Sequence, residues 1–290
     1  MKKFFILIPV YNDWKSLFKL LNEINLVITP IKNIEFNCII INDASTTEHH
    51  NMQIPSNIRT IKLINMSKNK GHARCNAFGI RHLSKLEDYD YVILMDGDGE
   101  DKPEELKLLV DKALLKTNVS IVAKRIKRSE GFFFQFLYQL HKIITFVFTG
   151  KNINFGNYSC LTKNDVKILS TKESLWSSFS GTVKYHIKNL DFINSIRGLR
   201  YFGPSKMSLI NLVIHSISII AVFKRIVFLR SVILIIIFSY LSSTIPTVAA
   251  TFQILLVVFN LFVYLVSLRE NKESFENSEA NEKSSTTYTH

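Results

Sequence analysis

Tyr91-Val-Ile-Leu-Met-Asp-Gly-Asp-Gly-Glu-Asp-Lys-Pro-Glu-Glu-Leu106 is the stretch of sequence that defines the fold. Its apolar first part, Tyr91 to Met95, predicts a buried strand. Pro103 and the two glutamates after it are typical of the first turn of a helix. Carboxylates crowded at the end of a buried strand repel one another, so a cation is the natural compensation. Because Gly97 and Gly99 permit a sharp turn beside a bulky ligand, we interpret this loop as a metal–diphosphate site.

Short apolar runs rich in β-branched residues predict four more strands in the first half of the chain. They are Phe4–Pro9, Phe36–Ile41, Ile58–Ile64 and Val119–Ala123. Apolar residues at helical spacing lie between the first two runs and again after Gly71. This alternation predicts an α/β fold with a mostly parallel, Rossmann-like sheet covered on both faces. Asn12, Asp43 and Asp96 each follow a strand, so we expect them to share one ligand-binding crevice.

Residues 231–268 predict a membrane hairpin. These 38 residues contain no Asp, Glu, Lys or Arg, and Ser242-Ser243-Thr244-Ile245-Pro246 lies in their middle. The run is too long for one span of about 20 residues and suits two short spans joined by a turn. A buried hairpin of a soluble domain is the alternative, although uncharged runs of this length are rare there. The N-terminal residues Met1–Val10 lack a cleavage site and suit a strand better than a signal peptide.

The formal net charge of +12 is unevenly distributed. Between Phe192 and Arg230 there are six basic residues and no acidic ones, and Arg269 with Lys272 lies beyond the apolar run. Basic flanks favour the cytoplasmic side of an inner membrane, so both ends of the hairpin and the large N-terminal domain are predicted to be cytoplasmic. Because the charge adjoins the apolar run, we favour anionic lipid over nucleic acid as its partner. The three cysteines have no paired spacing and fit a reducing compartment.

Two further segments, 132–148 and 207–223, are apolar with a narrow stripe of polar residues at helical spacing. Such amphipathic helices would lie in the headgroup layer of a membrane, and ordinary core helices are the alternative. We therefore divide the chain into a first α/β domain (1–130), a region with the two amphipathic segments (131–225), two transmembrane helices (226–268) and a polar tail (269–290). The tail is poor in apolar residues and is predicted to be disordered.

Six motifs in order resemble the family 2 glycosyltransferases with the nucleotide-diphospho-sugar-transferase fold. Within that family they are most similar to the polyprenyl-phosphate (dolichol-phosphate-mannose-synthase-like) branch, whose bacterial members include some with a membrane hairpin. Each motif is weak alone, but their order is specific. The motifs are Ile8-Pro9-Val10-Tyr11-Asn12, Ile41-Asn42-Asp43-Ala44-Ser45, Asn69-Lys70-Gly71-His72-Ala73-Arg74, Met95 to Glu100, Ala123 to Glu130, and Arg200 to Lys206.

The resemblance implies roles at the nucleotide end. Pro9, Tyr11 and Asn12 would border the base, and Asp43 would accept hydrogen bonds from the base or the ribose. Taken alone, Asp43 is better explained as a turn-capping aspartate.

The resemblance also implies a metal site. Asp98 and Glu100 would ligate Mg²⁺ or Mn²⁺, with Asp96 near the ribose or the metal. Carboxylate and diphosphate oxygens suit these hard cations. The family often has Gln where Glu100 stands, so the additional charge leaves the role of Glu100 open.

Basic residues would hold the phosphates. Arg125 and Arg128 would do so by bidentate bonds that Lys cannot make. Gly71 and Arg74 lie at a predicted helix start, where phosphate also binds, and His72 is either a ligand-facing group or a simple helix-start residue. The resemblance adds Arg200 and Lys206 as further substrate-binding residues.

The reaction implied is inverting displacement at the anomeric carbon of a nucleotide-sugar with release of a nucleoside diphosphate. Polyprenyl phosphate is the expected acceptor, and an anionic phosphate needs little help from a general base. Relatives usually carry a Gly-Asp-Phe-Arg-like motif where this chain has Gly156-Asn157-Tyr158-Ser159. Two alternatives therefore stay open: transfer to a lipid-linked glycan or other cell-envelope hydroxyl, and a non-catalytic membrane scaffold. The sugar, the nucleotide and the formation of a homo-oligomer are not determined by the sequence.

Overall fold

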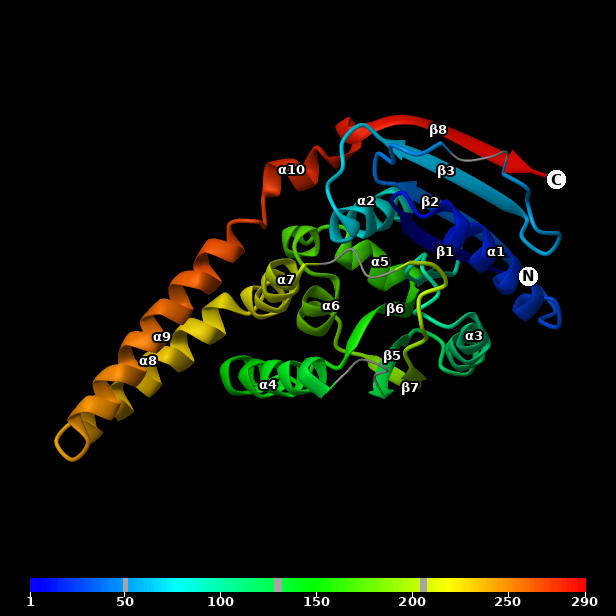
Figure 1. The fold of residues 1–290 in the computed structure, drawn as a ribbon. Helices are drawn as coiled ribbons and strands as arrows, with labels where there is room; N and C mark the ends of the chain where they lie inside the picture. Colours follow the sequence, from blue (N-terminus) through cyan, green and yellow to red (C-terminus); the bar gives the residue numbers. More distant parts are fainter. Residues whose placement is uncertain (49–51, 128–131, 204–207) are drawn as a thin grey trace.

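An eight-stranded sheet forms the centre of the computed structural model, which describes residues 1–48, 52–127, 132–203 and 208–290 (Figure 1). The order of its strands is β7-β5-β6-β4-β1-β2-β3-β8. The strands are β1 (Lys2–Val10), β2 (Ile34–Asn42), β3 (Thr60–Met66), β4 (Tyr91–Leu94), β5 (Ser120–Lys127), β6 (Phe155–Thr162), β7 (Leu190–Ile196) and β8 (Glu282–Thr289).

The five strands predicted from apolar runs are β1 to β5, and all five are present. The sheet is more mixed than the predicted parallel arrangement, because β6 runs antiparallel to both β4 and β5 and β8 runs antiparallel to β3. The central strands β1, β2, β3 and β4 are parallel. Their carboxyl ends therefore lie along one edge of the sheet, where ligands bind in α/β folds.

Helices cover both faces of the sheet, and the sheet separates the apolar core into two layers. On one face α1 (Trp14–Ile28) and α3 (Leu106–Leu115) pack, and on the other α2 (His72–Ser84), α5 (Lys163–Leu169) and α6 (Phe179–His186) (Figure 1). All four residues of β4 are buried because both faces are covered. All three cysteines are buried and unpaired, as packing residues would be.

Both predicted amphipathic helices are present, as α4 (Phe132–Thr149) and α7 (Leu209–Ala221). Each leaves large apolar side chains exposed: Phe136 and Phe146 on α4 are 58% and 59% exposed, and Ile210 on α7 is 72% exposed. Strands β6 and β7, which follow α4 in the chain, lie in the same sheet as β1 to β5. The region 131–225 is therefore built onto the first domain rather than folded beside it.

Two long helices, α8 (Lys224–Leu241) and α9 (Pro246–Ser267), lie side by side and project from the domain (Figure 1). Within the described part of the chain, α9 alone is long and apolar enough to cross a membrane, and 17% of its most apolar window is buried. Three of the first seven residues of α8 are basic, and its uncharged part, 231–241, is only about 16 Å long at 1.5 Å per residue. The hairpin is thus a helix pair, and its two spans stay a prediction.

The prediction of a disordered tail is wrong. After α9 the chain forms the short helices α10 (Lys272–Glu276) and η3 (Ser278–Asn281), and then β8 at the edge of the sheet (Figure 1). The composition is polar because this strand is mostly exposed, but its backbone groups pair with β3 from Thr60 to Met66. Buried Phe275 anchors the turn before the strand. The segment has too little apolar surface to fold alone. It becomes ordered because Phe275 anchors it and because the edge of β3 offers backbone groups to pair with.

Candidate active site

The acidic loop 96–101 begins where β4 ends and leads into η1 (Pro103–Glu105), as its sequence predicts. Gly99 has φ +86°, a left-handed conformation that glycine adopts without strain. A Cβ on Gly97 would meet the carbonyl oxygen of Pro9 at 3.0 Å. The loop therefore packs against the end of β1, and Pro9 supports its backbone.

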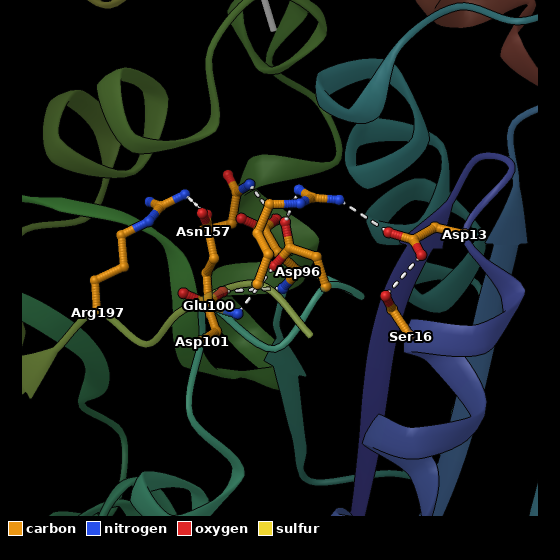
Figure 2. A network of polar contacts seen from close by, with 9 residues as sticks. Asp13, Ser16, Asp96, Glu100, Asp101, Asn157 and Arg197 are labelled. Carbon is orange, nitrogen blue, oxygen red and sulfur yellow. Dashed lines mark hydrogen bonds and ion pairs between the residues drawn. The ribbon is translucent and has the colours of Figure 1, made fainter. Parts of the chain in front are cut away.

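Asp96 lies at the centre of a buried polar cluster (Figure 2). The side-chain amide of Asn157 donates to Asp96 Oδ1 at 2.9 Å, and the backbone N–H of Asp96 donates to Asp101 Oδ2 at 2.9 Å. Burial opposes the ionisation of Asp96, but the charges of His72 and Arg197, with the Asn157 amide, outweigh it and lower the pKa of Asp96. Burial and the nearby Asp96 raise the pKa of Asp101 to about 8. The surroundings thus favour the anionic form of Asp96 and the protonated form of Asp101.

Asp98 is held by Arg200. The guanidinium of Arg200 donates through Nη1 to Asp98 Oδ2 at 2.5 Å and through Nη2 to Asp13 Oδ2 at 2.9 Å. This bridge joins the loop after β4 to the start of α1. Burial and the neighbouring Asp96 raise the pKa of Asp98 to about 6, although Arg200 acts in the opposite direction. Even beside Arg200, the negative charge of Asp98 is therefore only partly compensated.

The segment 197–201, just after β7, lies across the acidic loop. The backbone N–H of Gly198 donates to the Glu100 carbonyl at 2.8 Å, and that of Tyr201 donates to the Asp98 carbonyl at 2.9 Å. Arg197 forms an ion pair with Glu100 (Figure 2). Glu100 thus faces this segment, while Asp101 is the acid that contacts Asp96.

Arg125, near the end of β5, reaches the same cluster. A Cβ on Gly156 of β6 would lie 2.3 Å from its Nη2 atom, so the guanidinium occupies the space that this glycine leaves free. Its positive charge acts to lower the pKa of both Asp96 and Asp101. The structure therefore brings Arg125 to the acidic loop as predicted. Arg128 and Lys206 lie outside the described residues.

The loops after β1 and β2 contact each other at the same edge of the sheet. Asn12, which has φ +49°, accepts hydrogen bonds through Oδ1 from the backbone N–H groups of Thr46 and Thr47 at 2.8 and 3.1 Å. Tyr11 beside it is 40% exposed. Asp43 accepts from the backbone N–H groups of Lys70 and Gly71 at 2.7 and 2.8 Å. Asp43 therefore caps the turn before α2, as the alternative interpretation of this residue proposed.

The start of α2 places basic groups near these loops. Arg74 donates to the Lys70 carbonyl at 3.1 Å and lies over the Trp176 ring at 5.8 Å. His72 lies close enough to the acidic cluster for its charge to lower the pKa of Asp96. Its ring lies 5.8 Å from that of His215 on α7. Burial, His72 and Arg125 lower the pKa of His215 to about 3.

Four residues of the cluster were not predicted as site residues. Asp101 lies in the acidic stretch that follows the fourth predicted strand, and Asp13 directly follows the motif that ends at Asn12. Both are therefore adjacent to residues that the sequence pattern did single out. His215 was noted only as part of a polar stripe, and Arg197 only as positive charge. These two reach the cluster through α7 and through the segment after β7, and neither contact is visible in a linear pattern.

The donor set suits a hard divalent cation, since it consists of carboxylate oxygens that repel one another. Among the described residues, however, no three such side chains are already arranged to hold an ion. The reason is visible at Asp98, whose Oδ1 accepts from the Glu100 backbone at 3.0 Å while Oδ2 accepts from Arg200. Arginines neutralise the loop here, and a cation would replace them.

A sheet with an acidic loop after a central strand, and with arginines turned toward that loop, is typical of nucleotide-diphospho-sugar transferases. A family model described as glycosyl transferase family 2 matches residues 5–178. The chain belongs to this family.

The curated relative matched is the uncharacterised glycosyltransferase sll0501 of Synechocystis sp., 30% identical over 142 residues. The match covers 48% of this chain and less than half (43%) of the relative.

Among solved structures, the fold resembles glucosyl-3-phosphoglycerate synthase from Mycobacterium tuberculosis. One such structure, in complex with Mn²⁺, UDP and phosphoglyceric acid, has a TM-score of 0.53 at 12% identity and covers 78% of each chain. Another, with Mn²⁺, UDP-glucose and phosphoglyceric acid, has a TM-score of 0.52 at 13% identity, covering 78% of this chain and 80% of that one. A structure titled only as a mycobacterial protein has a TM-score of 0.52 at 12% identity, covering 78% and 74%. At these identities the likeness shows a shared fold.

Proposed function

We propose that the protein is a membrane-anchored inverting glycosyltransferase that moves a sugar from a nucleotide-sugar to polyprenyl phosphate. The observation that carries this proposal is the cluster of Asp96, Asp98 and Asp101 facing Arg125 and Arg200, at the carboxyl edge of a family 2 fold. Near this cluster, the ring of His215 on α7 lies 5.8 Å from that of His72, and α7 and its neighbour α4 both carry exposed apolar side chains. Donor and lipid acceptor would meet there.

The nucleotide would bind over Pro9, Tyr11 and Asn12, with its diphosphate toward Asp98. Mg²⁺ or Mn²⁺ held by Asp96 and Asp98, or by Asp98 and Glu100, would supply charge stabilisation of the leaving diphosphate. Arg200 would release Asp98 and bind a phosphate oxygen instead, because guanidinium groups bind carboxylates and phosphates in the same bidentate manner. Arg125 remains beside Asp96 and adds fixed positive charge where negative charge develops.

Asn157 favours a phosphate acceptor over a hydroxyl acceptor. An amide cannot remove a proton, and here it donates to Asp96, which already has a lowered pKa. Asp96 is thus held as a stable anion, a poor general base. A phosphate acceptor arrives ionised and needs only to be positioned in line with the anomeric carbon.

Contacts among α4, α8 and α9 support a position at the membrane surface. Arg230 of α8 donates to the carbonyl of Val147 at 2.8 Å, and so caps the last turn of α4. Gln253 of α9 donates to Ser239 Oγ of α8 at 2.8 Å, the kind of bond that joins helices in lipid. Amphipathic α4 is therefore fixed at the base of the helix pair, where the headgroups would be. This arrangement supports an active site on the basic side of the helix pair, which would be the cytoplasmic side of an inner membrane.

The proposed activity can be tested with membranes from cells that express the protein. A panel of radiolabelled nucleotide-sugars is added with Mn²⁺, and the lipids are extracted. We expect label from one donor in a short phospholipid that mild acid hydrolyses, because a sugar phosphodiester at an anomeric carbon is acid-labile. Label in an acid-stable, larger glycolipid would indicate the hydroxyl acceptor instead. Label in neither fraction with any donor would contradict both.

Mn²⁺ is expected to raise the melting temperature of the purified protein at neutral pH but not below about pH 5. The pKa of Asp98 is raised to about 6, mainly by burial, so this group takes up a proton as the pH falls through that value. Proton and metal then compete for the same oxygens. At 100 times its dissociation constant a ligand stabilises by about 2.7 kcal/mol. Scanning fluorimetry with and without Mn²⁺ measures the shift, and an equal shift at both pH values would contradict the assignment.

A further inference from the structure

The chain beyond α9 returns to the domain and is anchored there. Phe275 of α10 is 2% exposed, with its ring centroid 6.2 Å from that of Trp176 and under the Arg81 guanidinium at 4.6 Å. Arg81 also donates to the Glu276 carbonyl at 3.1 Å. The polypeptide that follows the membrane helix is therefore tied to α2 before β8 begins.

Asn281, the last residue before β8, clamps the turn that follows β3. Its carbonyl accepts from the Ser67 backbone N–H at 2.7 Å, and its Oδ1 accepts from the Ser67 hydroxyl at 2.6 Å. Its Nδ2 donates to the Lys68 carbonyl at 3.2 Å. One side chain thus satisfies two groups of a turn more than 200 residues away in sequence.

This turn leads directly to the backbone N–H groups that Asp43 accepts. Ser67 and Lys68 begin the turn, and Lys70 and Gly71 end it at the start of α2. Gly71 has φ +89°, so the turn depends on its flanking contacts for its shape. Asn281 holds one end of the turn and Asp43 holds the other.

A second connection runs from β8 to the same edge of the sheet. Asn65 donates to Ser284 Oγ at 3.1 Å and accepts from Asn42 Nδ2 at 2.8 Å. The Oδ1 atom of Asn42 accepts from the Ser45 backbone at 3.0 Å, and Ser45 Oγ accepts from the Asn12 backbone at 2.9 Å. This unbroken row of hydrogen bonds ends at Asn12, on the nucleotide side of the site.

We propose that the C-terminal segment 272–289 completes the nucleotide-binding end of the active site, with Asn281 as its main positioning residue. The ligand concerned is the nucleoside diphosphate part of the donor, and the inference rests on the proposed function. Asn281 acts through the turn 67–71 and through Asp43. Because the segment directly follows the helix that would cross the membrane, it also ties the donor end of the site to the membrane anchor.

The test uses the full-length protein purified in detergent. Titration calorimetry with UDP, GDP, ADP and CDP in the presence of Mn²⁺ identifies the nucleotide that the wild type binds tightest. With that probe, Asn281→Ala is expected to raise the dissociation constant about 3- to 10-fold, because the two side-chain hydrogen bonds that hold the turn are lost and water replaces them in part. Asn281→Asp keeps the acceptor for Ser67 and should give an intermediate value.

Two further measurements separate positioning from general loss of structure. Hydrogen–deuterium exchange should increase in a peptide covering 67–74 and stay unchanged in one covering 34–42. At saturating donor, kcat should change less than about twofold while KM rises with the dissociation constant. Asn164→Ala, the same change at an exposed residue of α5 outside the segment 272–289, is the matched control and should behave as the wild type.

The outcomes are distinct. Wild-type affinity in Asn281→Ala, or faster exchange in both peptides, would overturn the inference and leave the proposed function standing. A wild type that binds none of the four nucleotides would overturn the proposed function, and the inference with it.

Discussion

Replacing Asp98 with asparagine is expected to lower sugar transfer by at least about 100-fold, while the protein stays folded and membrane-bound. Asparagine is almost isosteric but offers one neutral oxygen where the aspartate offers two charged ones. The cation that stabilises the leaving diphosphate would then lose a ligand. Transfer of labelled sugar to extracted lipid, at equal amounts of membrane protein, measures the effect.

The fold should tolerate this change because it does not favour the charge that is removed. Burial and the nearby Asp96 raise the pKa of Asp98 to about 6 from its ordinary 3.8. The folded state therefore binds this proton more tightly than the unfolded state, so an ionised Asp98 lowers stability above that pH. We expect the melting temperature of Asp98→Asn to be no lower than that of the wild type at neutral pH.

Asp111→Asn is the matched control, because Asp111 is an exposed acid on α3 whose partner is Lys107 one turn away. Such a surface pair contributes little, about 0.3–0.5 kcal/mol, and transfer should be unchanged. An Asp98→Asn protein that keeps more than about a tenth of the wild-type rate would exclude this residue from the catalytic site.

Replacing Gly99 with alanine is expected to be the most destabilising single-methyl change in the acidic loop. The added Cβ would lie 2.5 Å from the ring of Tyr201, and the backbone has φ +86°. An alanine at positive φ costs about 1 kcal/mol, and overpacking adds about 1–3 kcal/mol. Because Tyr201 donates its backbone N–H to the Asp98 carbonyl, the clash would also push the segment 197–201 off the loop. Both the melting temperature and the transfer rate should fall.

Gly203→Ala measures the cost of backbone strain at positive φ in the absence of a steric clash. Gly203 has φ +68°, but nothing lies within 4 Å of where its Cβ would be. It should therefore show only the backbone cost of about 1 kcal/mol. Melting curves of the two variants and the wild type, recorded in the same detergent, make the comparison. Equal shifts for both variants would mean that Tyr201 moves aside without cost and that the segment is not held against the loop.

The residue pattern was sufficient for the strands and for the acidic loop. Each of the five predicted strands is an apolar run that becomes buried on both faces, and such runs are recognised without knowing their neighbours. Asp96 and Asp98 could be singled out because they closely follow β4, whose carboxyl end lies at the edge where ligands bind. Arg125 lies within β5, and only the family resemblance drew attention to it. The spacing of polar residues also predicted α4 and α7, because a helix face is a local property.

The tertiary structure alone decided which groups meet. Arg197 and Arg200 neutralise the loop because β7 pairs with β5 and delivers the following segment across it, more than 90 residues from the acids in sequence. The tail forms a strand only because the edge of β3 is there to pair with, so its polar composition was a poor guide. Periodicity and composition indicate which positions of a segment are buried and which are exposed. A contact between distant side chains depends on strand order, which no local pattern encodes.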